Sequence, residues 1–340
     1  MPESYTQRVR IRDVALAAGV SSATVSHVYS GRGRVSERTR VRVKAIGDRL
    51  GYQPNQTGQA LRLGRTNVVA VVASFRDPRI AEASFMPYFR NVLAGAVLEA
   101  GAAGLAVTAG RAGADGQIAT TLSYDGIIVV DPMPSDPVLE RAMSDGRPVV
   151  AVGGYDERPT ARIQRIRLAI RDALPEYLDE ISGSAKDLRP SIFVGPRLDH
   201  FTNDAIAGYQ RWCARRGITP QGGALEPGES LDDAAMRILS GVLPPTVVHC
   251  MNESFSAAVL RAAERLRLDV PGQLRVTTVG DPCGLGAQNG VDYFATDPFH
   301  NGSLAAKAMA ELVDGGAPAD ILLELPRVAV PPSPSLYRLA

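Results

Sequence analysis

Two short amphipathic segments joined by a glycine limit what the start of this chain can fold into. In residues 11–31, IRDVALAAGVSSATVSHVYSG, the small apolar face of a first helix is formed by Val14, Ala15 and Ala18. Gly19 then supplies the turn. Two helices at this spacing are typical of a helix-turn-helix, which places its second helix in the major groove of DNA.

The second helix has the composition of a groove-facing helix. Ser21 stands where an N-cap is needed, and Val25 and Val28 face back toward the first helix. The outward face keeps short polar and methyl-bearing side chains, which suit contacts with base edges: Ser22, Ala23, Ser26 and His27. DNA binding is therefore the first function that the sequence predicts.

The positive charge of the chain is concentrated at this end. The whole chain has a formal net charge of +1, yet residues 1–66 hold twelve Arg or Lys and four Asp or Glu, a net charge of +8. The remaining 274 residues therefore carry −7. Charge alone also fits a solvated face. Together with the helix-turn-helix pattern, this asymmetry indicates a basic nucleic-acid module attached to an ordinary body.

A third helix is predicted after Ser36, which can cap it. Its apolar stripe is Val43, Ile46 and Leu50, spaced three and four residues apart, and Gly51 is placed to end it. Contacts with DNA phosphates, which set affinity and register but do not read sequence, are expected from the basic residues around it: Arg38, Arg40, Arg42 and Lys44.

Residues 54–66 are polar and weakly helical. We interpret them as a hinge between a DNA-binding domain, residues 1–53, and a body, residues 67–340. Leu61 is one of two large apolar residues in this hinge. Two roles fit an exposed leucine here: docking on the next domain, or insertion into a minor-groove base step as an apolar wedge.

Residues 11–61 resemble the LacI/GalR family of bacterial transcription regulators. The chain keeps the spacing of the family without a gap through Asp13-Val14-Ala15, Gly19-Val20-Ser21, Thr24-Val25-Ser26, Val35-Ser36, Thr39, Leu50-Gly51-Tyr52 and Pro54-Asn55. The resemblance implies a homodimer whose recognition helices enter two major grooves of a near-palindromic operator. Paired hinge helices, with Leu61 as the wedge, would meet in the minor groove between them.

The resemblance also assigns roles within the helix-turn-helix. It implies base readout by Ser22, Ala23 and His27. Contacts with the DNA backbone fall on Ser21, Thr24, Ser26, Arg34, Arg38 and Asn55. Most family members have arginine at the position of His27, and the purine-repressor branch has histidine. Because arginine reads guanine bidentately whereas a histidine nitrogen makes one bond, the commonest family code does not predict this operator.

The body alternates buried strands with amphipathic helices, which indicates parallel α/β sheets. The expected strands are valine- and isoleucine-rich runs: 68–73, 105–109, 126–130, 149–153, 192–195, 247–251 and 276–280. The length favours two lobes, and the family has such a periplasmic-binding-protein-like α/β body. We place lobe one at about 67–155 and 294–326, and lobe two at about 156–293 and 327–340. Ligands of such folds lie between the lobes, at the carboxyl ends of the strands.

The expected effector site departs from the pattern of the family. Ala205 stands where most members have an arginine that grips the effector, so an ordinary sugar cannot be assumed. The hypothesis is a small polar ligand held by Tyr88, Phe89, Asp199, Asn203, Asn252 and Asp281. An anionic effector is an alternative, because arginines crowd residues 158–171, although a solvated face or lobe contact explains them equally well. Control by a partner protein, or by no effector, also stays open.

Other classes of protein fit the sequence poorly. The four histidines and the three cysteines show no metal-ligand spacing, and the chain has no GxSxG or Walker motif, so we expect no enzyme, metal or cofactor. A small-solute receptor is the alternative for the body, but the polar, basic N-terminus lacks a signal peptide. The odd number of cysteines fits the cytoplasm, and no apolar run is long enough to span a membrane.

The sequence therefore predicts allosteric repression by a dimer, in which a ligand between the lobes changes hinge order and operator affinity. Whether the ligand induces or corepresses, and whether the protein represses or activates, stays open. The rival from another class is an architectural DNA-binding protein without sequence preference.

Overall fold

The computed structural model describes residues 9–30, 34–52, 65–74, 86–155, 162–182, 187–196, 199–226, 228–282 and 288–329. The chain divides into two units, Met1–Thr66 and Asn67–Ala340.

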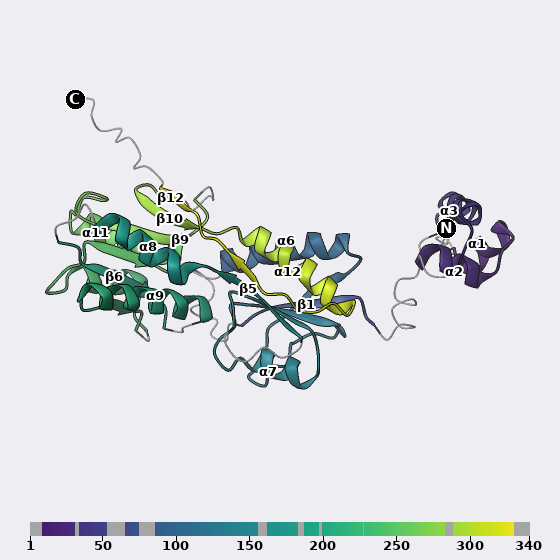
Figure 1. Ribbon diagram of the computed structural model, residues 1–340, viewed down its shortest axis with the longest axis horizontal. Coiled ribbons are helices and arrows are strands. Elements are labelled where there is room, and N and C mark those ends of the chain that lie inside the picture. Colours follow the sequence, from purple (N-terminus) through teal and green to yellow (C-terminus); the bar gives the residue numbers. More distant parts are fainter. Residues whose placement is uncertain are drawn as a thin grey trace, which may run out of the picture. The chain divides into compact units, whose positions relative to one another are not determined.

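Three helices make up the described part of the first unit: α1 (Ile11–Ala18), α2 (Ser22–Ser30) and α3 (Glu37–Leu50) (Figure 1). Gly19 ends α1 with φ 63° and ψ 40°, a left-handed conformation that glycine adopts at little cost. Ser21 and Ser36 cap the next two helices, since their Oγ atoms accept hydrogen bonds from the backbone N–H groups of Thr24 and Thr39. The helix-turn-helix thus forms where the sequence predicts it.

The three helices share one small core. Its buried members are Val14, Ala15, Ala18, Val25, Val28 and Val43. Leu50 does not belong to this core: it is 37% exposed, so the predicted stripe is wrong at its last position. Tyr29 packs over Gly47 instead, and a Cβ on that glycine would lie 1.8 Å from the tyrosine oxygen.

The second unit contains two six-stranded sheets. The first has the order β11-β5-β4-β3-β1-β2, and each pair of neighbours in it is parallel. Its strands are β1 (Val68–Ala73), β2 (Ala106–Ala109), β3 (Gly126–Val130), β4 (Val149–Val152), β5 (Ile163–Leu168) and β11 (Ile321–Leu323). Valine and isoleucine fill the central strands because both of their faces are covered.

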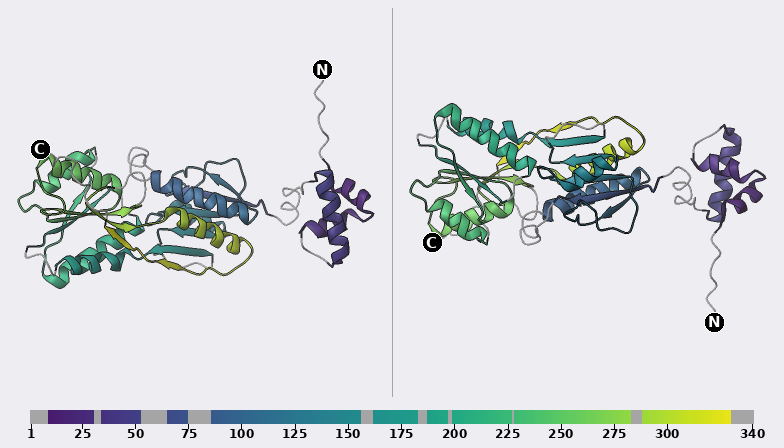
Figure 2. Two further views of the ribbon diagram at one scale, coloured as in Figure 1. Left: turned by 90° about the horizontal axis from the view of Figure 1, so that it is seen from above. Right: turned by 90° about the horizontal axis from the view of Figure 1, so that it is seen from below.

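Helices cover both faces of this sheet, which with them forms lobe one. α6 (Met86–Ala102) and α12 (Pro298–Val313) lie side by side on one face (Figures 1 and 2). Gly95 and Gly302 allow the two backbones to touch, since a Cβ on either would lie 1.9 Å from a carbonyl oxygen of the other helix. α7 (Pro137–Ser144) packs on the opposite face.

The second sheet, the centre of lobe two, has the order β12-β10-β9-β8-β6-β7, and β12 is its antiparallel edge. Its strands are β6 (Pro190–Val194), β7 (Gln221–Ala224), β8 (Val247–Cys250), β9 (Arg275–Gly280), β10 (Val291–Ala295) and β12 (Arg327–Ala329). The helices α8 (Ile170–Ser182) and α9 (His200–Arg216) cover one face, and α10 (Leu231–Leu239) and α11 (Glu253–Arg265) cover the other.

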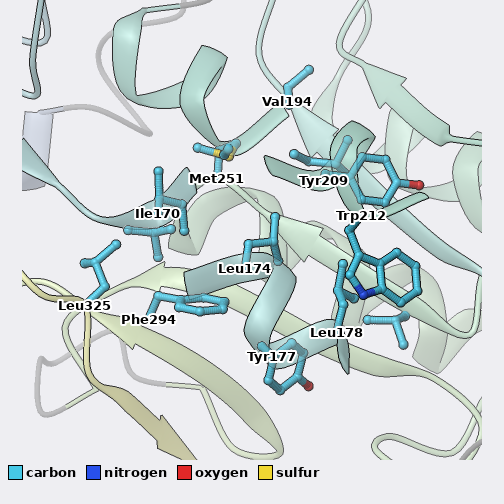
Figure 3. Packing of buried hydrophobic residues seen from close by; sticks show 14 of the residues in the cluster. Ile170, Leu174, Tyr177, Leu178, Val194, Tyr209, Trp212, Met251, Phe294 and Leu325 are labelled. Carbon is cyan, nitrogen blue, oxygen red and sulfur yellow. The ribbon is translucent and has the colours of Figure 1, made fainter. Parts of the chain in front are cut away.

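Aromatic and aliphatic side chains from α8 and α9 fill the core on the first of these faces (Figure 3). Trp212 is fully buried, and its indole N–H donates to Asp179 over 2.7 Å. Leu174 and Leu178 of α8 lie between this indole and the ring of Phe294 from β10. This packing fixes α9, whose N-terminus lies at the carboxyl end of β6.

Three segments cross between the lobes: around Ala169, from Thr296 to Pro298, and from Glu324 to Pro326. The first boundary that we placed near residue 155 is wrong, because β5 pairs with β4 through Val149↔Ile163 and belongs to the first sheet. The second boundary, at 294, falls two residues inside β10. The two arginines of β5 made this segment look solvated in the sequence, so it was not predicted as a strand.

Candidate functional site

The outward face of α2 is open for contact. Ser22, Ala23 and His27, the three predicted base readers, are all exposed. Ser21 and Thr24 are held by a hydrogen bond of 2.9 Å between their hydroxyl groups, which fixes the start of the helix. Ser26 is partly buried. This surface has the size and polarity that base edges in a major groove require.

Basic side chains flank this face. Arg34, Arg38, Arg42 and Lys44 are exposed, whereas Arg40 lies 3.4 Å from the carboxylate of Glu37 in the same helix. Exposed basic groups of this kind suit the phosphate backbone. Two predicted DNA contacts, Asn55 and the wedge Leu61, lie outside the described residues.

A cavity of about 230 Å³ lies between the two lobes of the second unit. It has polar, aromatic and methionine side chains in its wall. Lobe one and the crossing segments contribute Ser74, Pro87, Tyr88, Asn91, Asp131, Met133, Leu168, Thr296 and Pro298. Lobe two contributes Gly195, Pro196, Asp199, Phe201, Thr202, Met251, Asn252, Glu253, Ser254, Phe255, Val279, Gly280 and Asp281. The cavity adjoins the carboxyl ends of β3, β6, β8 and β9, where α/β folds place their ligands.

The structure brings four of the six predicted effector residues to this wall: Tyr88, Asp199, Asn252 and Asp281. Phe89 is not part of the wall. It follows Tyr88 in α6, so its side chain points in another direction and packs against the core of lobe one. Asn203 is also absent from the wall. In α9, which begins at His200, Thr202 faces the cavity in its place. These two predictions are corrected accordingly.

Helix caps fix two of the polar groups from lobe two. Asp199 is the N-cap of α9, and its Oδ1 accepts a hydrogen bond of 2.7 Å from the N–H of Thr202. Asn252 is the N-cap of α11, and its Oδ1 accepts from the N–H groups of Ser254 and Phe255. Both side chains are therefore held rigidly at the rim of lobe two.

Asp131 is the main functional candidate that sequence reasoning missed. It directly follows β3, in a left-handed conformation with φ 49°. Its Oδ1 would lie 2.2 Å from a Cβ on Gly153, so the absence of a side chain there makes room for the carboxylate. The available signal was its place as the first polar residue after a buried strand, where parallel strands present ligand contacts.

Burial and like charge act together on the cavity carboxyls. Burial, followed by the negative charge of Asp199, raises the pKa of Asp131 well above its usual range. Burial likewise raises the pKa of Asp199, although its hydrogen bonds with Thr202 and the charge of His200 act in the opposite direction. In lobe two, burial and the charge of Asp281 raise the pKa of Glu253.

Three of the arginines that suggested an anionic effector form ion pairs away from the cavity. Arg165 of β5 forms an ion pair with Asp320, with 2.8 Å between Nε and Oδ2. Arg167 lies 3.0 Å from the buried carboxylate of Asp204 in α9, and Arg171 lies 3.5 Å from it. The first of these two pairs links lobe one to lobe two. None of the three arginines belongs to the cavity wall.

Within the part of the chain that the structure describes, no three His, Cys, Asp or Glu side chains are grouped to hold a metal ion. Cys213 and Cys250 are buried, and burial raises the pKa of both thiols. His249 is also buried; this lowers its pKa to about 3, and its Nδ1 lies 2.7 Å from the hydroxyl of Thr277. Ala205 is fully buried in the core of lobe two. Among the described residues, none of the helices is both long and apolar enough to span a membrane.

Comparison with known proteins matches both units. The family model described as bacterial regulatory proteins, lacI family, covers residues 10–55, and a periplasmic binding protein-like domain covers residues 186–330. The regulator MalR of Staphylococcus xylosus is 26% identical over 80% of this chain and 82% of its own length. The sucrose operon repressor of Klebsiella pneumoniae is 33% identical over 63% of this chain and 64% of its own length.

A solved structure supports the fold. The Lac repressor dimer bound to operator and the anti-inducer ONPF superposes with a TM-score of 0.70 at 20% identity, covering 95% of this chain and 98% of that one. The helix-turn-helix, the two-lobed body and these matches agree, and the chain belongs to the LacI family of bacterial regulatory proteins.

Proposed function

We propose that the protein is a transcriptional repressor of the cytoplasm that binds a near-palindromic operator as a homodimer, under the control of a small molecule between its lobes. The observation that carries the DNA-binding part is the exposed face of α2, where Ser22, Ala23 and His27 stand together beside exposed arginines. Curated relatives bear the names sucrose operon repressor and transcriptional repressor CytR, which favours repression.

An apolar surface on lobe one supports the homodimer. Val97 and Leu98 of α6 are 46% and 66% exposed, although the same helix buries its other face against α12. A second copy of this chain would cover them. Two copies related by a two-fold axis would also present two recognition helices, which matches a palindromic site.

The arrangement of the body supports control by a ligand. Three crossing segments join the lobes, and the cavity wall takes side chains from both. A ligand that touches both lobes favours the arrangement in which all its contacts are made. We expect this preference to change operator affinity through the lobe arrangement of the dimer.

Competition between duplexes tests the proposal. Duplexes would be selected from a random pool with the full-length protein, and the enriched sequence would then compete against bulk DNA at fixed salt. We expect an enriched two-fold symmetric sequence and a specificity ratio of about 10³ or more. Equal affinity for every duplex would instead identify a DNA-binding protein without sequence preference. His27→Ala supplies the control, since it should lower specific binding alone.

A further inference from the structure

The chemistry of the cavity wall indicates which ligand it accepts. Asp131 from lobe one and Asp199 from lobe two face the same cavity, and Glu253 and Asp281 add two further carboxylates. Among the described residues of the wall there is no lysine, arginine or histidine. A ligand that enters this cavity therefore meets negative charge from both lobes.

The half-buried carboxylate of Asp131 has no partner among the residues that the structure describes. Across the described residues, no hydrogen-bond donor or cationic group contacts it, and the one charge that acts on it is the negative charge of Asp199. A buried carboxylate without a donor is costly, so such groups are normally paired. Since the described residues supply no such partner, the site suits a ligand that brings a positive or hydrogen-donating group to this carboxylate.

The rest of the wall suits an organic cation. Tyr88, Phe201 and Phe255 place aromatic rings around the cavity, and ring faces attract ammonium groups. The volume of about 230 Å³ lies below the roughly 300–1,000 Å³ of typical drug-sized ligand pockets, which favours a small molecule. The carboxylates do not converge in the manner of metal ligands, since no group of three was found among the described residues.

We propose that the effector is a small organic amine whose protonated nitrogen lies between the carboxylates of Asp131 and Asp199. The inference rests on the proposed function, in which this cavity controls DNA binding. It also gives a physical reason for the two lobes to close on the ligand. Without a ligand, the two carboxylates repel each other across the cavity, whereas an ammonium group between them is attracted to both lobes.

Matched ligand pairs test this inference with the full-length protein. 1,4-Diaminobutane is compared with 1,4-butanediol, and 2-amino-2-deoxyglucose with glucose, by thermal shift and calorimetric titration. We expect binding of at least one amine and none of its neutral partner. Asp131→Asn keeps the shape of the side chain but removes its charge, and should weaken amine binding roughly tenfold to a hundredfold.

Glu140→Gln is the matched control, because it removes one carboxylate from the exposed surface of α7 in the same lobe. It should leave amine binding unchanged. Equal binding of the neutral partners, undiminished amine binding by Asp131→Asn, or no binding of either amine would overturn the inference. Operator binding is measured on the same samples: if it stays specific, failure concerns the amine alone, whereas its loss in the wild type contradicts the proposed function.

Discussion

The two units of this chain present opposite charge to their ligands, and they do so in opposite settings. In the first unit, Arg38, Arg42 and Lys44 are exposed on α3 and do not belong to the hydrophobic core of that unit. In the second, Asp131 and Asp199 line a cavity where burial raises the pKa of both carboxyls. The exposed cations of the first unit stay hydrated, so their charge costs little free energy. The cavity carboxylates lose hydration, so their charge costs free energy unless a ligand compensates it.

This difference separates what each unit can recognise. A surface rich in exposed cations binds any DNA through phosphates and leaves the recognition of sequence to a few neighbouring side chains. We propose that these are the exposed residues Ser22, Ala23 and His27. An enclosed pair of carboxylates selects strongly for charge, since it rejects anions and gains little from neutral molecules. Changes that remove charge should therefore act differently in the two units.

The largest expected effect is on the exposed cations. The triple variant Arg38→Ala, Arg42→Ala, Lys44→Ala should bind all DNA roughly a hundredfold more weakly near 0.1 M salt, because three phosphate contacts and their released counterions are lost. The salt dependence should fall by about 0.9 per contact in a plot of log affinity against log salt. Fluorescence anisotropy at several salt concentrations measures both. Lys307→Ala, an exposed lysine of α12, is the control and should change neither.

His27→Ala should separate the recognition of base sequence from the electrostatic attraction to DNA phosphates. We expect a loss of about 1–3 kcal/mol on the selected operator and no change on bulk DNA, because a base contact is lost while the phosphate contacts stay. Titration against both duplexes at one salt concentration measures this. An equal loss on the two duplexes would mean that His27 contacts the backbone.

A smaller effect is expected from the cavity in the absence of ligand. The pKa of Asp131 is raised in the folded protein, so its stabilising protonated form is fully present below the unfolded pKa of about 3.9 and is lost as pH rises through the folded pKa. Asp131→Asn stays neutral at every pH. Its melting temperature should therefore exceed that of the wild type by a margin that widens as pH rises. Asp199 and Tyr88 are the titratable groups near this carboxyl, and His200 acts on Asp199.

Thermal melts between pH 4 and pH 9 check the trend, with Glu140→Gln as control. A constant difference across this range would mean that the carboxyl of Asp131 is solvated like a surface group. A lower melting temperature for Asp131→Asn would indicate that the charge stabilises the unliganded lobes.

Much of the fold was predictable because local signals agreed with it. Glycine and serine caps mark α1, α2 and α3, and valine-rich runs mark β1, β3 and β4. β5 was missed, since IQRIRL carries arginines that look solvated. In the structure Arg165 and Arg167 are neutralised by Asp320 and Asp204, which lie 155 and 37 residues away in the sequence. No local pattern reveals partners at such separations.

The site was predictable where a helix start fixed it. Asp199 and Asn252 cap helices directly after strands, so their place at the cavity follows from sequence position. Phe89 and Asn203 do not line the cavity, because one step along a helix turns a side chain by about 100°. Asp131 was missed because its importance comes from Asp199, across the cleft, and from the lack of a donor among the described residues around it.

The smallest expected effect compares Asp131, whose carboxylate has no partner among the described residues, with a second polar group of the same kind. The hydroxyl of Tyr29 is buried in the first unit and has no hydrogen-bond partner among the described residues. It faces helix α3 at Gly47, away from the predicted base readers on α2, so Tyr29→Phe should stabilise this unit by about 1 kcal/mol without changing DNA binding. Chemical denaturation followed by circular dichroism measures the change.

Gly47→Ala sharpens this last test through a double-mutant cycle. In the wild type the new methyl group would meet the tyrosine oxygen at 1.8 Å, so the variant should be destabilised despite the better helix propensity of alanine. In the Tyr29→Phe background the nearest atom is the ring carbon at 3.1 Å, and most of that penalty should vanish. Additive effects would show that the hydroxyl and Gly47 are not in contact. The hydroxyl of Tyr29 should be removable with a gain in stability and no loss of DNA binding. It differs in this from the carboxylate of Asp131, whose removal should weaken binding of the proposed amine.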